Sequence, residues 1–133
     1  MLTDRGLDAA LSALAARSPV PVDVLVDAGL AASGRCSPTV EATAYFVVAE
    51  ALTNVAKHSH ATTCRVSVTS GGASREDALV RVEIHDNGVG GASLGKGHGL
   101  AGLSDRVAAV DGSLSVSSPQ GGPTVVSVAL PIS

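Results

Sequence analysis

A row of polar side chains crosses an otherwise apolar stretch of this sequence. In residues 37–59, SPTVEATAYFVVAEALTNVAKHS, the residues Asn54, Lys57 and His58 follow Glu50 at offsets of four, seven and eight. A helix turns by about 100° per residue, so these four side chains share one narrow stripe. The stripe offers a carboxylate that could act as a base or orient water, an amide oxygen for Mg²⁺, and a cation. The alternative is a solvated outer face, which is the usual meaning of such a row.

A second candidate residue, Asp86, ends a predicted strand. Over residues 80–84 apolar side chains alternate with polar ones, and Asp86 continues the apolar parity. Strand side chains point alternately to opposite faces, so the Asp86 carboxylate is expected on the buried side. A buried carboxylate needs a hydrogen-bond donor, and an adenine amino group is such a donor. Gly88 and Gly90 would let a flat ligand approach the backbone closely.

Glycine dominates the next segment, residues 88–99, which reads GVGGASLGKGHG. Six glycines in twelve residues predict a flexible lid rather than a helix or a strand. Gly97, His98 and Gly99 lead into a predicted helix, whose free amides and positive dipole end suit a phosphate. A plain glycine-rich turn is the alternative, because a lone G-x-G motif is weak evidence.

The remaining chain supplies the elements that must position these residues. The order predicts an α+β fold, a two-layer α/β sandwich with about five strands under three helices. Apolar periodicity predicts helices over 3–16, 37–59 and 100–107, and strands over 21–27, 64–69, 80–86, 113–117 and 124–130. We expect residues 1–133 to form a single domain, since this length is too short for two.

Composition excludes several classes of function. The chain is 45% hydrophobic with a net charge of −3, and its only aromatic residues are Tyr45 and Phe46. An acidic chain without an aromatic platform is not expected to bind nucleic acid. Cys36 and Cys64 lack metal-ligand spacing and are expected to be reduced thiols. No apolar run approaches the roughly 18 residues that span a bilayer, so we expect a soluble, cytoplasmic chain without direct membrane contact. Such a chain could still be one piece of a longer, membrane-anchored sensor.

Four motifs together resemble a known family. EALTNVAKHS (50–59) is similar to the N box of the histidine-kinase ATPase domain, DNGVGG (86–91) to its G1 box and GHGLAGLSDRV (97–107) to its G2 box. The tail GGPTVVSVALP (121–131) resembles the closing strand. The family is part of the GHKL superfamily, whose ATP-binding domain is the Bergerat fold. The short lid most resembles sensor kinases that pair with helix-turn-helix response regulators.

The resemblance implies an ATP site with Mg²⁺. Asn54 would ligate the metal, and Glu50 would polarise the attacking group or a water. Asp86 would hydrogen-bond the adenine amino group. The other implied contacts are Lys57 and His58 near the phosphates, Gly88 and Gly90 making room for adenine, the segment Gly97, His98, Gly99 and Leu100 holding phosphate oxygens, and Thr124 contacting Asp86 or its water.

Several positions stay open beside this resemblance. His58 and His60 are read equally well as surface residues at a helix end and in a loop, and Lys96 as a phosphate contact or a solvated side chain. Arg106 is expected to form an ion pair rather than to touch a ligand. Pro123 stands where the family usually has a glycine. This departure from the family pattern affects neither the magnesium nor the adenine positions.

The implied function is donation of the γ-phosphoryl group of Mg-ATP to a His on an upstream dimerisation helix. A phosphoacceptor His should lie exposed on a helix before an acidic residue, and neither His58, His60 nor His98 fits. His85 precedes an acid but belongs to a predicted strand, so the acceptor is expected upstream of this chain. The implied partners are the dimerisation helices and a response regulator. The alternatives are an anti-sigma-factor-type serine kinase and a regulatory nucleotide-binding module without phosphotransfer.

Overall fold

The computed structural model of the chain describes residues 2–26, 38–56, 61–71, 79–88, 100–119 and 121–131. The elements within these ranges are α1 (Leu2–Ala16), β1 (Val22–Val26), α3 (Pro38–Asn54), β2 (Cys64–Gly71), β3 (Leu79–Asp86), α4 (Leu100–Ala108), β4 (Ser113–Ser117) and β5 (Thr124–Pro131). Their bounds agree closely with the predicted elements. One difference concerns the long helix, which ends at Asn54 in its α-helical form and continues with π-helical geometry at Val55 and Ala56. Residues 57–59, predicted as its last turn, lie outside the described residues.

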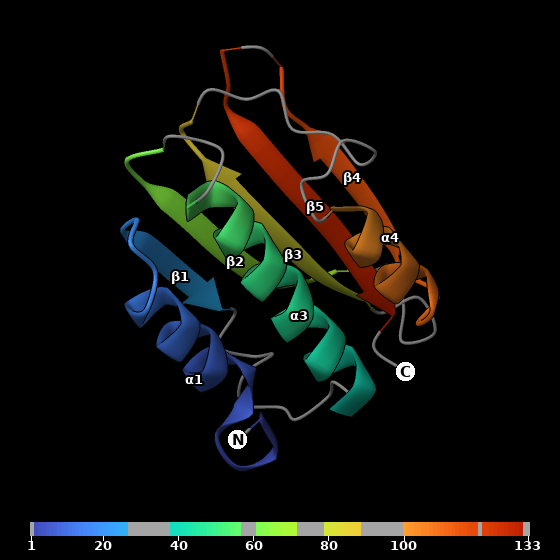
Figure 1. Ribbon diagram of the computed structural model, residues 1–133. Coiled ribbons are helices and arrows are strands. Elements are labelled where there is room, and N and C mark those ends of the chain that lie inside the picture. Colours follow the sequence, from blue (N-terminus) through green and yellow to red (C-terminus); the bar gives the residue numbers. More distant parts are fainter. Residues whose placement is uncertain are drawn as a thin grey trace.

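The strands form one mixed sheet in the order β1-β2-β3-β5-β4. β1 runs parallel to β2, and the other neighbouring pairs are antiparallel. The three described helices cover one face of this sheet, with α3 lying between α1 and α4 (Figure 1). The predicted α+β sandwich of two layers is therefore confirmed.

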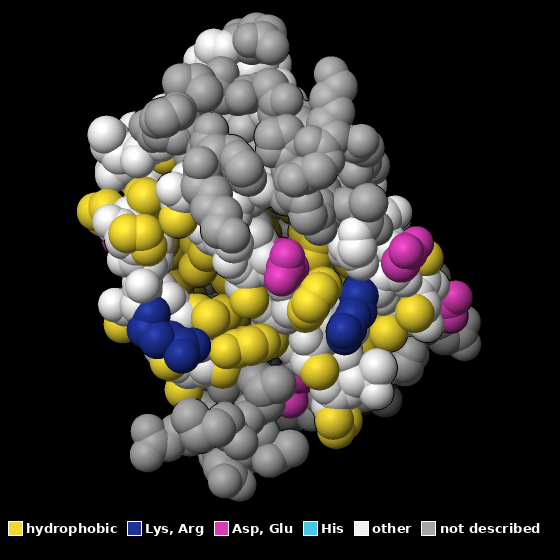
Figure 2. All heavy atoms as spheres, in the orientation of Figure 1, with side chains coloured by type: hydrophobic (Ala, Val, Ile, Leu, Met, Phe, Trp, Pro, Cys, Tyr) yellow, Lys and Arg dark blue, Asp and Glu magenta, His cyan; other side chains and the backbone are white. Residues whose placement is uncertain are grey.

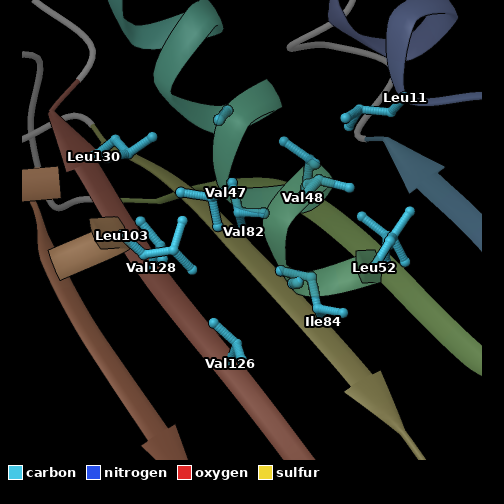
Figure 3. Close-up of a cluster of buried hydrophobic side chains, with 14 of the residues drawn as sticks. Leu11, Val47, Val48, Leu52, Val82, Ile84, Leu103, Val126, Val128 and Leu130 are labelled. Atoms are coloured by element: carbon cyan, nitrogen blue, oxygen red, sulfur yellow. The ribbon is translucent and has the colours of Figure 1, made fainter. Parts of the chain in front are cut away.

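The core lies between α3 and the middle of the sheet. Val47 and Val48 of α3 are fully buried and face Val82 and Val128 of the central strands (Figure 3). Further apolar side chains from α1 and α4 complete the layer, among them Leu11 and Leu103. Because β3 and β5 alternate buried and more exposed residues, their inward side chains meet the helices and their outward side chains lie on the opposite face of the sheet.

The sequence of α3 explains why this helix is so deeply placed. Pro38 occupies its first position, where a missing N–H costs nothing, and Glu41 lies in the positive first turn. The one buried hydroxyl on its inner face, that of Thr43, donates to the Thr39 carbonyl oxygen at 2.9 Å. The helix therefore buries a long apolar face without an unpaired polar group. None of the helices in the described ranges has the length and apolar character needed to cross a membrane.

A tight turn closes α4 against the sheet. Asp111 has a φ of 60°, and the Gly112 amide donates to the Val107 carbonyl oxygen at 2.9 Å. A Cβ on Gly112 would lie 2.8 Å from the Ala129 carbonyl oxygen. Glycine is therefore required here by the close approach of the turn between α4 and β4 to β5.

Candidate functional site

Asp86 is the buried carboxylate that the strand parity predicts. Its side chain is 5% exposed and lies on the helix-covered face of the sheet. The Gly88 amide donates to Asp86 Oδ1 at 2.8 Å, which is the hydrogen bond of an Asx turn. Among the described residues no donor to the second oxygen, Oδ2, is recorded. This arrangement fits an amino group that enters from a ligand, because a buried carboxylate is costly while an acceptor site stays empty.

The electrostatics of Asp86 follow from its burial. Removal from water raises the pKa of the Asp86 carboxyl above its ordinary value, and the Gly88 hydrogen bond offsets part of that rise. Cys64, opposite Asp86 on β2, is a buried free thiol. Burial first, and then the negative charge of Asp86, raise the pKa of Cys64 to about 12, against a lowering by a hydrogen bond with the backbone of Arg65. The thiol is thus neutral at physiological pH, as expected for a structural cysteine; Cys36 lies outside the described residues.

Thr124 begins β5 directly opposite Asp86 in the sheet register. Its side chain is 7% exposed, and its hydroxyl shares a hydrogen bond of 2.6 Å with the Ser118 hydroxyl. The structure therefore brings Thr124 beside Asp86, whereas the recorded partner of its hydroxyl is Ser118. A contact of Thr124 with Asp86 or its water stays a prediction. The Gly122–Pro123 peptide bond just before this strand is cis.

Asn87 makes a set of contacts that the sequence analysis did not assign. Its Oδ1 accepts hydrogen bonds from the amides of Thr62 and Thr63 at 2.9 and 3.0 Å. Its Nδ2 donates to the Thr62 hydroxyl at 2.8 Å. The only sequence signal for this cluster is the position of Asn87 between Asp86 and Gly88, in a motif that carries chemistry.

Glu50 and Asn54 lie on the last turns of α3. Both side chains are half-buried, and their spacing of four residues places them on one side of the helix. An amide oxygen at this position suits Mg²⁺, which typically takes few protein ligands when phosphates supply the others. The half-buried Glu50 carboxylate lies next to it on the stripe and could orient a proton-bearing group. The residues present therefore fit a Mg-nucleotide with its metal at α3 and its base at Asp86.

The rest of the predicted site falls outside the described residues: Lys57, His58, His60, Gly90, Lys96, Gly97, His98 and Gly99. Leu100 begins α4, as the predicted helix required. The lid predicted over 88–99 is described only at Gly88, which is buried.

Two surface hollows lie on the described part of the molecule. One of about 230 Å³ is at the strand ends that carry Asp86 and Asn87, and its other lining residues are Asp23, Thr63, Cys64, Arg65, His85 and Pro123. The other, of about 260 Å³, is a groove between α1 and α3. Figure 2 shows apolar side chains gathered along the helical face that includes this groove. Asp86 lines only the first of the two.

Arg106 differs from its prediction. The guanidinium lies over the Phe46 ring, 4.3 Å from its centroid, and no ion pair of Arg106 is recorded among the described residues. Within the described part of the chain, a cation–π contact with Phe46 of α3 is therefore the recorded interaction of Arg106, and the expected ion pair is not found there.

Residues 39–133 match the family described as histidine kinase-, DNA gyrase B-, and HSP90-like ATPase. Since the match covers more than half of the chain, the chain belongs to this family. The family resemblance of the four sequence motifs is confirmed.

The curated relatives that match are sensor kinases, so within this family the chain is of the type of the ATP-binding catalytic domain of two-component sensor histidine kinases. The chain is 33% identical over 97 residues to sensor histidine kinase YvfT of Bacillus subtilis (strain 168), covering 72% of this chain and 24% of the relative. It is 38% identical over 85 residues to sensor histidine kinase DesK of the same organism, covering 62% and 21%. The signal transduction histidine-protein kinase/phosphatase UhpB of Salmonella typhimurium is 37% identical over 97 residues, covering 71% and 18%. The chain thus spans about a quarter or less of the length of these relatives.

Solved structures agree with the fold. The ATP binding domain of PrrB from Mycobacterium tuberculosis matches with a TM-score of 0.63 and 28% identity, covering 96% of this chain and 91% of that chain. The blue-light activated histidine kinase of Erythrobacter litoralis EL346 matches with a TM-score of 0.66 and 22% identity, covering 95% and 39%. The latter likeness concerns the fold alone.

Proposed function

We propose that this domain binds Mg-ATP and donates the γ-phosphoryl group to a His on dimerisation helices that lie outside this chain. The observation that carries the proposal is Asp86, a buried carboxylate whose Oδ1 accepts from the Gly88 amide and whose Oδ2 has no recorded donor in the described part of the chain. Among the described residues no other hydrogen bond or charge offsets the cost of burying this carboxylate, and the adenine amino group would supply such a hydrogen bond. A response regulator is the proposed next phosphoryl acceptor, and the cytoplasm the proposed compartment.

The proposed roles divide between two elements. Asp86 would accept a hydrogen bond from the adenine amino group, with Gly88 holding the carboxylate in orientation. Asn54 would bind Mg²⁺, which when present neutralises phosphate charge during transfer. Glu50, one turn earlier, would accept a hydrogen bond from the N–H of the attacking imidazole and so raise the nucleophilicity of its other ring nitrogen. Lys57 would lie near the phosphates, as would the amides of Gly97 to Leu100.

Phosphotransfer in two settings tests this proposal. Incubated alone with radiolabelled ATP and Mg²⁺, the chain should gain no acid-labile phosphate, since His85, the one acid-flanked histidine, lies on a strand and pairs with Glu83 at 3.5 Å. Mixed with the acceptor helices of its own full-length kinase, it should label their His.

A matched pair of variants on α3 makes the test specific. Asn54→Ala should slow labelling by about ten- to a hundredfold, as expected for losing a group that holds or orients a metal, yet leave metal-free nucleotide binding. Thr53→Ala, its exposed neighbour, whose hydroxyl donates to the Ala49 carbonyl oxygen, should label normally. Labelling of the isolated chain at a histidine, or full activity of Asn54→Ala, would contradict the proposal.

A further inference from the structure

Asn87 extends the pairing of β2 and β3 by one step beyond the end of the ladder. The regular register ends at Cys64 opposite Asp86. Beyond it, the Asn87 amide donates to the Thr63 carbonyl oxygen at 3.4 Å, and the side chain makes three shorter hydrogen bonds to Thr62 and Thr63. A single exposed side chain therefore holds the segment that precedes β2 against the end of β3.

We infer that Asn87 is a positioning residue that latches the chain following α3 to the strand end that carries Asp86. The inference rests on the proposed function, because it concerns the two halves of the same nucleotide site. Thr62 follows Asn54 by eight positions in the sequence, and Asn87 directly follows Asp86. The latch therefore ties the segment just before β2, which follows α3 in the chain, to the strand end that presents Asp86 for the proposed adenine half.

The chemistry of the side chain suits this task. An amide oxygen has two lone pairs, and Oδ1 uses them for the amides of Thr62 and Thr63. The amide nitrogen supplies the donor that the Thr62 hydroxyl accepts. Alanine would keep none of these bonds. Aspartate would keep the oxygen for both amides, and the Thr62 hydroxyl can rotate to donate to its second oxygen.

Mg-ATP and adenosine differ in their need for the latch. Adenosine requires only the Asp86 half, which the Gly88 amide holds independently of Asn87. Mg-ATP spans both halves, so it binds tightly only when their separation is fixed beforehand. Loss of the latch should therefore weaken Mg-ATP more than adenosine, whereas a merely structural role would weaken both equally or neither.

Hydrogen exchange tests whether the latch exists in solution. In the Asn87→Ala variant of the full chain, the Thr62 and Thr63 amides should exchange roughly two- to tenfold faster, the range expected for losing one net hydrogen bond each. Asn87→Asp should keep their exchange close to wild type. Thr69→Ala, an exposed threonine further along β2, serves as the control and should leave both amides unchanged.

Titrations of the same variants test the positioning role. Asn87→Ala should bind Mg-ATP about tenfold more weakly by calorimetry and adenosine within about twofold of wild type by chemical-shift titration. Thr62→Ala should lie between, and the double variant should be no weaker than Asn87→Ala, because both changes remove one shared bond.

The outcomes separate the latch from the function it serves. Unchanged exchange in Asn87→Ala would overturn the latch, and equal losses for adenosine and Mg-ATP would overturn its positioning role. Failure of the wild-type chain to bind Mg-ATP would instead overturn the proposed function, and with it the positioning role, whatever the exchange data show for the latch.

Discussion

At the scale of single residues, the burial of Asp86 favours ligand binding but lowers the stability of the nucleotide-free protein. Its carboxylate lies in the core-facing layer at 5% exposure, where only the Gly88 amide is recorded as a donor among the described residues. The neighbouring Cys64 thiol is neutral and offers no positive charge in compensation. A carboxylate in this position favours a ligand donor at the expense of the stability of the nucleotide-free protein.

Asp86→Asn should therefore stabilise the nucleotide-free protein at neutral pH. A carboxyl whose pKa is raised on folding favours the folded state below its unfolded pKa, and that contribution is lost as the pH rises through the folded pKa. The asparagine variant has no such titration and keeps an oxygen for the Gly88 amide. Its advantage over wild type should be larger at neutral pH than below the ordinary Asp pKa of 3.8.

Chemical denaturation of both proteins at several pH values measures this difference, and groups common to the two cancel. A difference in unfolding free energy that stays constant with pH, or that shrinks toward neutral pH, would show that burial of the Asp86 charge costs nothing.

At the scale of elements, the sequence predicted those features that depend on the period of its apolar residues. The inward position of Asp86 follows from the alternation of β3, and the buried face of α3 from its apolar spacing. The contacts of Asn87 could not be predicted in this way, because its hydrogen-bond partners lie 24 and 25 residues away and side-chain bonds leave no period in the sequence. The stacking of Arg106 on Phe46 was missed for the same reason, since it depends on how α4 packs against α3.

Two glycines, Gly102 in the first turn of α4 and Gly112 in the turn between α4 and β4, should respond in opposite ways to alanine. A Cβ at Gly102 would meet nothing within 4 Å, so Gly102→Ala should stabilise the protein by about 0.5–1 kcal/mol through helix propensity. A Cβ at Gly112 would meet the Ala129 carbonyl oxygen at 2.8 Å and a Val107 methyl at 2.9 Å. Gly112→Ala should destabilise by about 1–3 kcal/mol.

Thermal unfolding of the two variants and wild type checks this pair. Since both changes add one methyl group, one within α4 and one in the turn that follows it, each is the control for the other. If Gly112→Ala were as stable as wild type, the close packing of the α4–β4 turn on β5 would be wrong.

At the scale of the whole molecule, the two-layer fold brings together residues far apart in the sequence. The helical layer carries Glu50 and Asn54 at the end of α3, and the sheet carries Asp86 with Thr124 opposite it. The chain belongs to a family of ATPase domains, and this membership implies that its ligand is ATP. If the proposed nucleotide site is divided between the two layers in this way, a connection such as the Asn87 latch matters for a ligand that spans both.

Calorimetric titration with Mg-ATP tests the central claim most directly, by comparing the wild-type chain with Asp86→Asn and with Arg81→Gln. Arg81 lies on the same strand with its side chain exposed, so its change alters charge without touching the buried side. Wild type and Arg81→Gln should bind at one site with similar affinity, and Asp86→Asn should bind about ten- to a hundredfold more weakly, the loss expected for a charge-assisted hydrogen bond replaced by a mismatched donor. Binding of Asp86→Asn within twofold of wild type, or no binding by the wild-type chain, would contradict the account.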